Sequence, residues 1–131
     1  MQENFYRCSI KDAGKLPSPC VKLMCTVGKV ETQGITMFPQ LAPSKELYQY
    51  YLANRDINPN WWDKYRERFL EEMQGVQMQI GIHTILQLLQ SGIRVAIMCF
   101  CPNANTCHTS LLEAEIRRRI AEIEEGKYEV Y

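Results

Sequence analysis

The alternation of apolar and polar residues divides the chain into short apolar runs and longer segments with helical spacing. Residues 20–27 are apolar except at Lys22 and Thr26, and residues 94–101 are apolar throughout after Arg94. Runs of this length and density predict strands that are covered on both faces, as in a parallel sheet. Shorter, mixed segments at 5–10 and 127–131 predict two further strands, and residues 28–41 read as a loop.

Helical spacing fills the segments between these runs. Ser44 is a good N-cap for a helix that should fade in the polar stretch 54–59, and Asn60 can cap a second helix that continues to Met73. Gly75 or Gly81 is expected to separate this helix from a third one. The third helix should stop at Ser91-Gly92, and the last should stop near Gly126. The last helix carries an apolar stripe of Leu112, Ile116, Ile120 and Ile123.

A helix, a buried strand and another helix in succession are the rhythm of βαβ units. We therefore predict an α/β fold, with a compact single domain over residues 1–131 and a mostly parallel sheet flanked by helices. The length of 131 residues fits one domain of this type.

Charge and composition exclude several classes of partner. The chain has 15 basic and 15 acidic residues, whereas general nucleic-acid binding needs a basic excess to neutralise phosphates. Residues 1–10 lack the pattern of a secretory signal, and no apolar run approaches the roughly 20 residues of a membrane span. We therefore expect a cytoplasmic protein with no membrane contact. In that reducing compartment, the six cysteines should be thiols, core residues or ligands rather than disulfides.

The segment 99–110 carries the most chemistry. It runs from the end of the buried strand, at Cys99, through a turn to a helix start that Thr106 can cap. Ligands of open α/β sheets lie beyond the carboxyl ends of the strands, and a helix N-terminus offers unpaired N–H groups to an anion. Ser44 and Lys45 form another helix start that can contact an anionic group.

Cys107 and His108 should fall in the first turn of the last helix. The helix dipole there lowers the pKa of a thiol, so Cys107 is the best candidate for a nucleophile. A base must come within hydrogen-bond reach of it. His108 is adjacent, but neighbours on a helix rarely face one another, so His83 is the alternative. The same segment also offers a ligand set that zinc accepts, namely Cys99, Cys101, Cys107 and His108.

Several motifs occur together in a familiar order. Leu41-Ala-Pro-Ser-Lys-Glu-Leu47 is followed by Tyr65-Arg-Glu-Arg-Phe69, then by the strand that ends in Cys99, and then by Cys107-His108. This order resembles the bacterial family called domain of unknown function 488, over about residues 5–112.

The resemblance implies a compact α/β domain whose motif residues gather at one end of the sheet. The matching positions are Ser44, Arg68, Cys99, Cys107 and His108. Two positions depart from the family pattern, because Cys101 replaces a glutamate and Thr109 replaces an arginine. Both changes remove charge from the expected site. The family itself has no settled activity, so the resemblance implies a pocket rather than a reaction.

Three functions remain open from the sequence. The first is binding of a small anionic, nucleotide-like molecule, which the protein would sequester. Its expected contacts are Ser44, Lys45, Arg68, Cys101, Asn105, Thr106, Cys107, His108 and Thr109. The second is a cysteine-dependent enzyme that uses Cys107 with a histidine, and the third is a zinc-stabilised interaction domain. A homo-oligomer that pairs through Trp61 and Trp62 is also expected.

Overall fold

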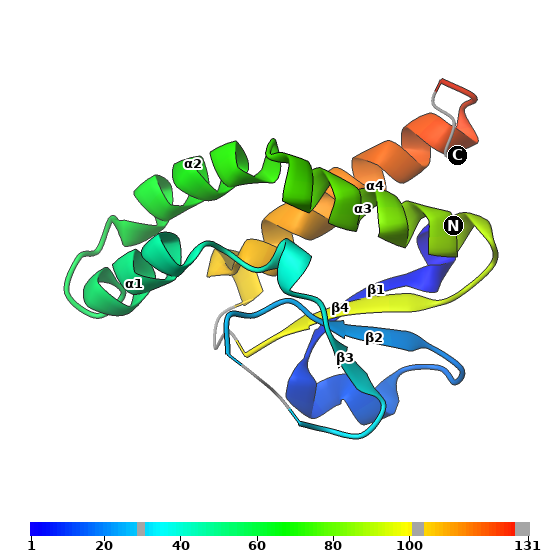
Figure 1. The fold of residues 1–131 in the computed structure, drawn as a ribbon, viewed down its shortest axis with the longest axis horizontal. Coiled ribbons are helices and arrows are strands. Elements are labelled where there is room, and N and C mark those ends of the chain that lie inside the picture. The colour runs from blue at the N-terminus through cyan, green and yellow to red at the C-terminus, as the bar shows by residue number, and fades with distance from the viewer. Residues whose placement is uncertain (29–30, 101–103, 128–131) are drawn as a thin grey trace.

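A computed structural model of the chain describes residues 1–28, 31–100 and 104–127 (Figure 1). The strands are β1 (Phe5–Ser9), β2 (Val21–Met24), β3 (Ile35–Met37) and β4 (Val95–Cys99). The α-helices are α1 (Lys45–Asn54), α2 (Trp61–Met73), α3 (Val76–Gln90) and α4 (His108–Glu124). Short 3-10 helices are η1 (Gln2–Asn4), η2 (Ile10–Lys15), η3 (Pro39–Leu41) and η4 (Ala104–Thr106).

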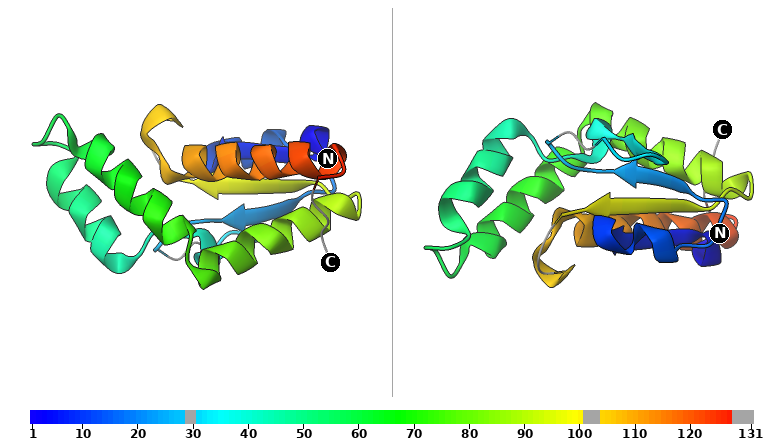
Figure 2. Two further views of the ribbon diagram at one scale, coloured as in Figure 1. Left: turned by 90° about the horizontal axis from the view of Figure 1, so that it is seen from above. Right: turned by 90° about the horizontal axis from the view of Figure 1, so that it is seen from below.

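The four strands form one parallel sheet in the order β1-β4-β2-β3. β4 is central, and its first residue, Val95, pairs with Phe5 of β1 on one side and Val21 of β2 on the other. All five residues of β4 are buried. Figure 2 shows the reason, since α4 covers one face of the sheet and α3 covers the other. The predicted α/β class and the strand covered on both faces are confirmed.

The prediction of a loop over residues 28–41 is wrong, because this segment contains β3 and η3. β3 is an edge strand of three residues that pairs only with β2, where Ile35 lies opposite Lys22. A strand this short, with Thr36 exposed between two half-buried residues, shows too little periodicity to be recognised. Of the strand predicted at 127–131, residues 128–131 lie outside the described residues.

The helix boundaries follow the capping residues of the sequence. The Ser44 hydroxyl accepts a hydrogen bond from the Leu47 N–H at 3.1 Å, which confirms Ser44 as the N-cap of α1. α3 and α4 are followed by Gly92 and Gly126, whose φ angles of 83° and 75° lie in the left-handed region that glycine favours. Gly75 separates α2 from α3.

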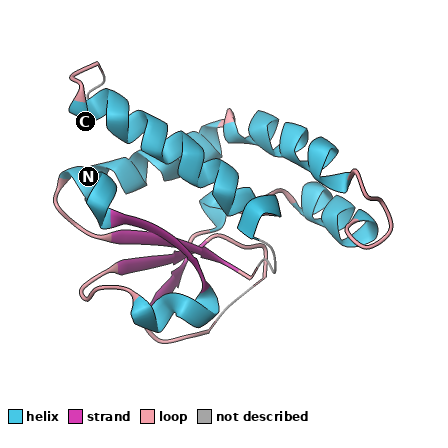
Figure 3. Cartoon of the chain, turned by 180° about the vertical axis from the view of Figure 1, so that it is seen from behind, coloured by secondary structure: helices cyan, strands magenta, loops and turns pink. Residues whose placement is uncertain are grey.

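Helices α1 and α2 lie side by side and extend beyond the end of the sheet (Figure 1, Figure 3). Tyr51 of α1 contacts Trp61 of α2, with ring centroids 5.2 Å apart, and Trp61 lies 5.7 Å from Tyr65 of the same helix. Phe69 stacks on Tyr65 and also contacts His108 at the start of α4. These rings join the helical pair to the carboxyl end of the sheet.

Within the described residues, no helix is long and apolar enough to cross a membrane.

Replacing Ser44 with alanine should lower the free energy of unfolding by about 1 kcal/mol, because the Leu47 N–H loses its cap. The change also removes the hydroxyl that donates to Glu72 of α2. Ser91→Ala is the matched control, because the Ser91 hydroxyl bonds only the exposed end of α3, and we expect a change within about 0.5 kcal/mol. Urea denaturation followed by circular dichroism measures both values. Equal stability of the two variants would contradict the assignment.

Candidate functional site

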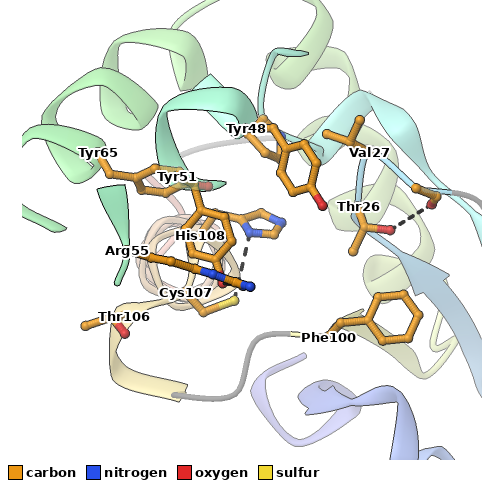
Figure 4. Close-up of a pocket in the computed structure, with 12 residues that line it drawn as sticks. Thr26, Val27, Tyr48, Tyr51, Arg55, Tyr65, Phe100, Thr106, Cys107 and His108 are labelled. Atoms are coloured by element: carbon orange, nitrogen blue, oxygen red, sulfur yellow. Dashed lines mark hydrogen bonds between the residues drawn. The ribbon is translucent and has the colours of Figure 1, made fainter. Parts of the chain in front are cut away.

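A cavity of about 290 Å³ opens at the carboxyl end of the parallel sheet. It lies between the segments that follow β2 and β4, helix α1, and the start of α4 (Figure 4). This is the position at which open α/β sheets bind ligands. The lining residues are Thr26, Val27, Gly28, Pro43, Tyr48, Tyr51, Arg55, Tyr65, Phe100, Thr106, Cys107 and His108.

Four aromatic side chains form part of the cavity walls. Tyr48 and Tyr51 of α1 stack with centroids 6.2 Å apart, and Tyr65 of α2 lies 6.0 Å from Tyr51. Phe100, directly after β4, stands across the cavity from them and is 55% exposed (Figure 4). Flat faces of this kind favour a planar apolar group.

Arg55 adds a positive charge to these walls. Its guanidinium lies over the Tyr51 ring at 5.1 Å from the centroid, and Nη1 donates to the Tyr51 hydroxyl at 3.0 Å. Asp56 is 3.6 Å away, but its side chain is 85% exposed. An ion pair so open to water is weak, so the Arg55 charge remains available to an anion.

His108 forms part of the cavity floor and is only 5% exposed. Its Nε2 is hydrogen-bonded to the backbone carbonyl of Cys25, which can only accept, so Nε2 carries the proton. Burial lowers the pKa of His108 to about 4, although the bond to Cys25 raises it in part. The ring is therefore neutral near pH 7, and its Nδ1 lone pair is directed toward Cys107 Sγ at 3.8 Å.

Two sulfur atoms and a hydroxyl lie together beneath the cavity. Cys107 Sγ is 3.2 Å from Cys99 Sγ and 3.1 Å from Thr109 Oγ1, and Cys99 Sγ is 3.5 Å from the same hydroxyl. Arg7 Nη1 contacts Thr109 Oγ1 at 3.5 Å, while Arg7 Nε pairs with Glu113 at 3.1 Å.

Cys107 is disulfide-bonded, whereas Cys8, Cys20, Cys25 and Cys99 are free thiols. The prediction that no cysteine forms a disulfide is therefore wrong for Cys107. That prediction rested on the redox compartment alone. It ignored how the return of the chain from β4 into α4 brings sulfur atoms close together.

The predicted cap of the last helix is displaced by one residue. Cys107, not Thr106, is the N-cap of α4, with an extended backbone at φ −131° and ψ 140°. Because Cys107 stands outside the helix, its side chain can face His108, and the sequence-based objection to this pair does not hold. The alternative base, His83, lies on α3 and does not line the cavity.

The remaining predicted site residues are divided between the cavity and other parts of the molecule. Thr106 lines the cavity, Asn105 is exposed, Thr109 is buried behind Cys107, and Cys101 lies outside the described residues. Arg68 is on α2, with its guanidinium 5.8 Å from the centre of the Tyr50 ring.

Ser44, Lys45 and Glu72 line a second hollow, which adjoins the cavity because both are lined by Thr26, Val27 and Pro43. The Glu72 carboxylate accepts hydrogen bonds from both the backbone N–H of Ser44, at 2.8 Å, and its hydroxyl. A carboxylate of the protein thus already occupies the start of α1. Ser44 and Lys45 do not line the cavity that Cys107 lines, so the structure does not bring them together with Cys107.

The sequence reading missed Tyr48, Tyr51, Arg55 and Phe100. Tyr48 and Tyr51 of α1 and Arg55, its C-cap, lie on one face because they are spaced by three and four residues. That spacing is also typical of a helix face packed against a core, so it does not by itself distinguish a binding wall from a buried stripe.

For a metal, the described residues contain no group of three or more His, Cys, Asp or Glu side chains with suitable geometry. Of the four predicted zinc ligands, Cys107 is in a disulfide and His108 uses Nε2 for the Cys25 carbonyl.

A family model described as the active DUF488-N3 subclade matches residues 25–120. The match covers most of the chain, so the protein belongs to the family called domain of unknown function 488, and the resemblance drawn from the motifs is confirmed. No curated protein and no solved structure matches the chain.

The lowered pKa of His108 makes stability depend on pH. The unfolded chain binds a proton at this residue near pH 6.5, while the folded chain does so only near pH 4. Stability from this residue should therefore be complete above pH 6.5 and fall as the pH drops to 4, by about 3 kcal/mol. His108→Gln, which keeps a donor for the Cys25 carbonyl, should show a flatter profile. Denaturant titrations between pH 4 and 8 test this, and parallel profiles for the two proteins would contradict it.

Proposed function

We propose that this protein binds a small molecule that joins a planar ring to an anionic group, as a nucleotide does. The observation that carries the proposal is the charge of Arg55 beside a cavity walled by Tyr48, Tyr51 and Phe100. A ring would be held by the aromatic faces, and the anion by the guanidinium. Sequestration of such a molecule needs no catalytic group.

The start of α4 supplies a second favourable element for the anion. Thr106, Cys107 and His108 all line the cavity, so the positive end of the helix dipole lies at its edge. The Cys107 side chain makes no capping hydrogen bond to this helix. Backbone N–H groups at the start of α4 can donate hydrogen bonds to an anion placed at this edge of the cavity.

The cavity size limits the ligand. A volume of about 290 Å³ lies at the lower end of the range for small-molecule sites. This volume suits a molecule of about the size of a mononucleotide, and it is too small to enclose a dinucleotide.

A second candidate function is a cysteine-dependent enzyme. It is favoured by the 3.8 Å approach of His108 Nδ1 to Cys107 Sγ inside a ligand-sized cavity. The family model is described as an active subclade, which is in keeping with this candidate. Such an enzyme would need Cys107 in its reduced form.

We infer a cytoplasmic location for this activity. Four of the cysteines are free thiols, and in oxidising compartments thiols are more often joined in disulfides.

Titration with adenosine monophosphate, adenosine and ribose 5-phosphate tests the binding proposal. Adenosine monophosphate should bind more tightly than adenosine or ribose 5-phosphate, because only the monophosphate can contact both the aromatic walls and Arg55. Arg55→Gln should weaken monophosphate binding about tenfold, which corresponds to about 1.4 kcal/mol, and leave adenosine binding nearly unchanged. Isothermal titration calorimetry measures each affinity.

Arg66→Gln is the matched control, because Arg66 is an exposed arginine of α2 that does not line the cavity. It should bind like the unmodified protein. Native mass spectrometry of protein purified without added ligand extends the test to other bound molecules. A bare chain, together with no saturable binding of the monophosphate, would overturn the proposal.

A further inference from the structure

The second hollow holds a carboxylate whose charge is not neutralised by an ion pair. The hollow has a volume of about 570 Å³, and Glu72 is one of the residues that line it. The Glu72 carboxylate accepts hydrogen bonds from the N–H and the hydroxyl of Ser44, which are both uncharged donors. None of the ion pairs among the described residues involves Glu72. Because a carboxylate can accept about four hydrogen bonds, Glu72 keeps lone pairs for a positive group in the hollow.

A second acceptor in the wall of the hollow also has no donor. Oε1 of Gln40 is buried and forms no hydrogen bond with the described residues. The backbone of Gln40 is held in place because η3 packs closely on α3 at Gly81, where an added Cβ would lie 3.2 Å from Gln40 Cβ. The Gln40 side chain is only half-buried and lines the hollow, so its amide can rotate to present the oxygen there. Since an unpaired buried acceptor is unfavourable, a donor in the hollow favours this rotation.

One face of α1 leads from the hollow to the cavity. Its residues are spaced by four, three and four positions, so they follow one another along the helix: Ser44 at the N-cap, Tyr48, Tyr51, and Arg55 at the C-cap. At roughly 1.5 Å per residue, Arg55 lies about 16 Å from Ser44 along the helix axis. The carboxylate beside Ser44 is therefore at one end of this face, the tyrosine rings are in the middle, and the guanidinium is at the other end.

The cavity and the hollow are close enough to receive one molecule. Three residues line both of them, namely Thr26, Val27 and Pro43. The charge of Glu72 also acts on the cavity, because burial raises the pKa of the Tyr65 hydroxyl and the Glu72 charge raises it further. A ligand that extends from the cavity past the shared residues thus approaches a negative charge.

Lys45 is the cation that also lines the hollow. It is exposed and forms no ion pair with Glu72 among the described residues. An ammonium group surrounded by water leaves Glu72 without a partner, but its charge opposes the entry of another cation. Removal of the Lys45 charge should therefore strengthen the binding of a cation in the hollow.

We propose that the second hollow binds the positively charged end of the same ligand, a primary ammonium group held by Glu72 and Gln40. The ligand class is then a nucleotide-like anion that carries an amine on its ring side, with opposite charges at its two ends. An ammonium group has three donors, which suits two acceptors in the wall of one hollow. The inference rests on the proposed function for the ring and the anion, whereas the ammonium site is defined by the hollow alone.

N6-(6-aminohexyl)adenosine 5′-monophosphate tests this inference, with N6-hexyladenosine 5′-monophosphate as the uncharged comparison. Both compounds offer a phosphate to Arg55 and a ring to the tyrosines, and only the first ends in an ammonium group. The aminohexyl compound should bind the full chain about tenfold more tightly in isothermal titration calorimetry. Glu72→Gln, which keeps an oxygen for Ser44, should abolish this preference. Lys45→Gln should increase it about twofold.

Glu71→Gln is the matched control, because Glu71 is the exposed neighbour of Glu72 on α2 and does not line the hollow. It should keep the full preference, and Arg55→Gln should weaken both compounds equally. If Glu72→Gln fails to fold, Gln40→Leu takes its place and should reduce the preference about threefold. Equal affinities of the two compounds for the unmodified protein, or a preference that survives Glu72→Gln, would refute the inference.

Hexylammonium, which has neither a ring nor an anion, separates this inference from the proposed function. If neither adenosine compound binds, the proposed function fails, and the hexylammonium titration then decides on the ammonium site. Shifts of the backbone amide NMR signals of Gly75 and Gln77, which line the hollow, would support the site if Glu72→Gln abolishes them. A titration that moves neither signal would refute the site as well.

Discussion

The hydrogen bond from His108 to the carbonyl oxygen of Cys25 joins the start of α4 to the end of β2 inside the protein. It satisfies a carbonyl that has just left the sheet, and it fixes which ring nitrogen carries the proton. Because Nε2 carries the proton, Nδ1 carries the lone pair. The bond to Cys25 orients the ring and so fixes the direction of that lone pair. Phe69 packs against the same ring and holds its plane. The geometry of Cys107 and of the cavity floor depends on this one contact.

Around that floor, two parts of the molecule meet. The carboxyl end of the parallel sheet supplies Phe100 and the segment after β2, and the pair of helices α1 and α2 supplies the tyrosines and Arg55. The series of ring contacts from Trp61 through Tyr65 to Phe69 connects the helical pair to His108. Packing of the helices therefore places the cavity walls over its floor.

The parts of the fold that could be predicted are those determined by local sequence. The apolar run of β4 and the glycines after α3 and α4 each act within a few residues, so they can be recognised without the fold. The family resemblance likewise came from motifs read in order along the chain. The short edge strand β3 could not be predicted, because its partner β2 and not its own sequence makes it a strand.

The candidate site, like the fold, could be predicted only in part from the sequence. Cys107 and His108 could be selected from their place after a buried strand, but the direction of their side chains depends on Cys107 being the N-cap. The carboxylate that occupies the helix start at Ser44 belongs to Glu72, a residue 28 positions away that no local pattern connects to it. Arg55 could not be predicted as a site residue from the sequence, because it lines a cavity only when α1 is packed at the end of the sheet.

The separate origin of walls and floor has a consequence for how such a domain can diversify. The tyrosine walls belong to the helical pair, whereas Phe100 and the floor residues Cys107 and His108 belong to the segment that leads from β4 into α4. Substitutions at Tyr48 and Tyr51 can reshape these walls without changing the hydrogen bond that holds His108 below. Walls and floor can therefore vary one at a time, and related chains can keep the same floor beneath cavities of different shape.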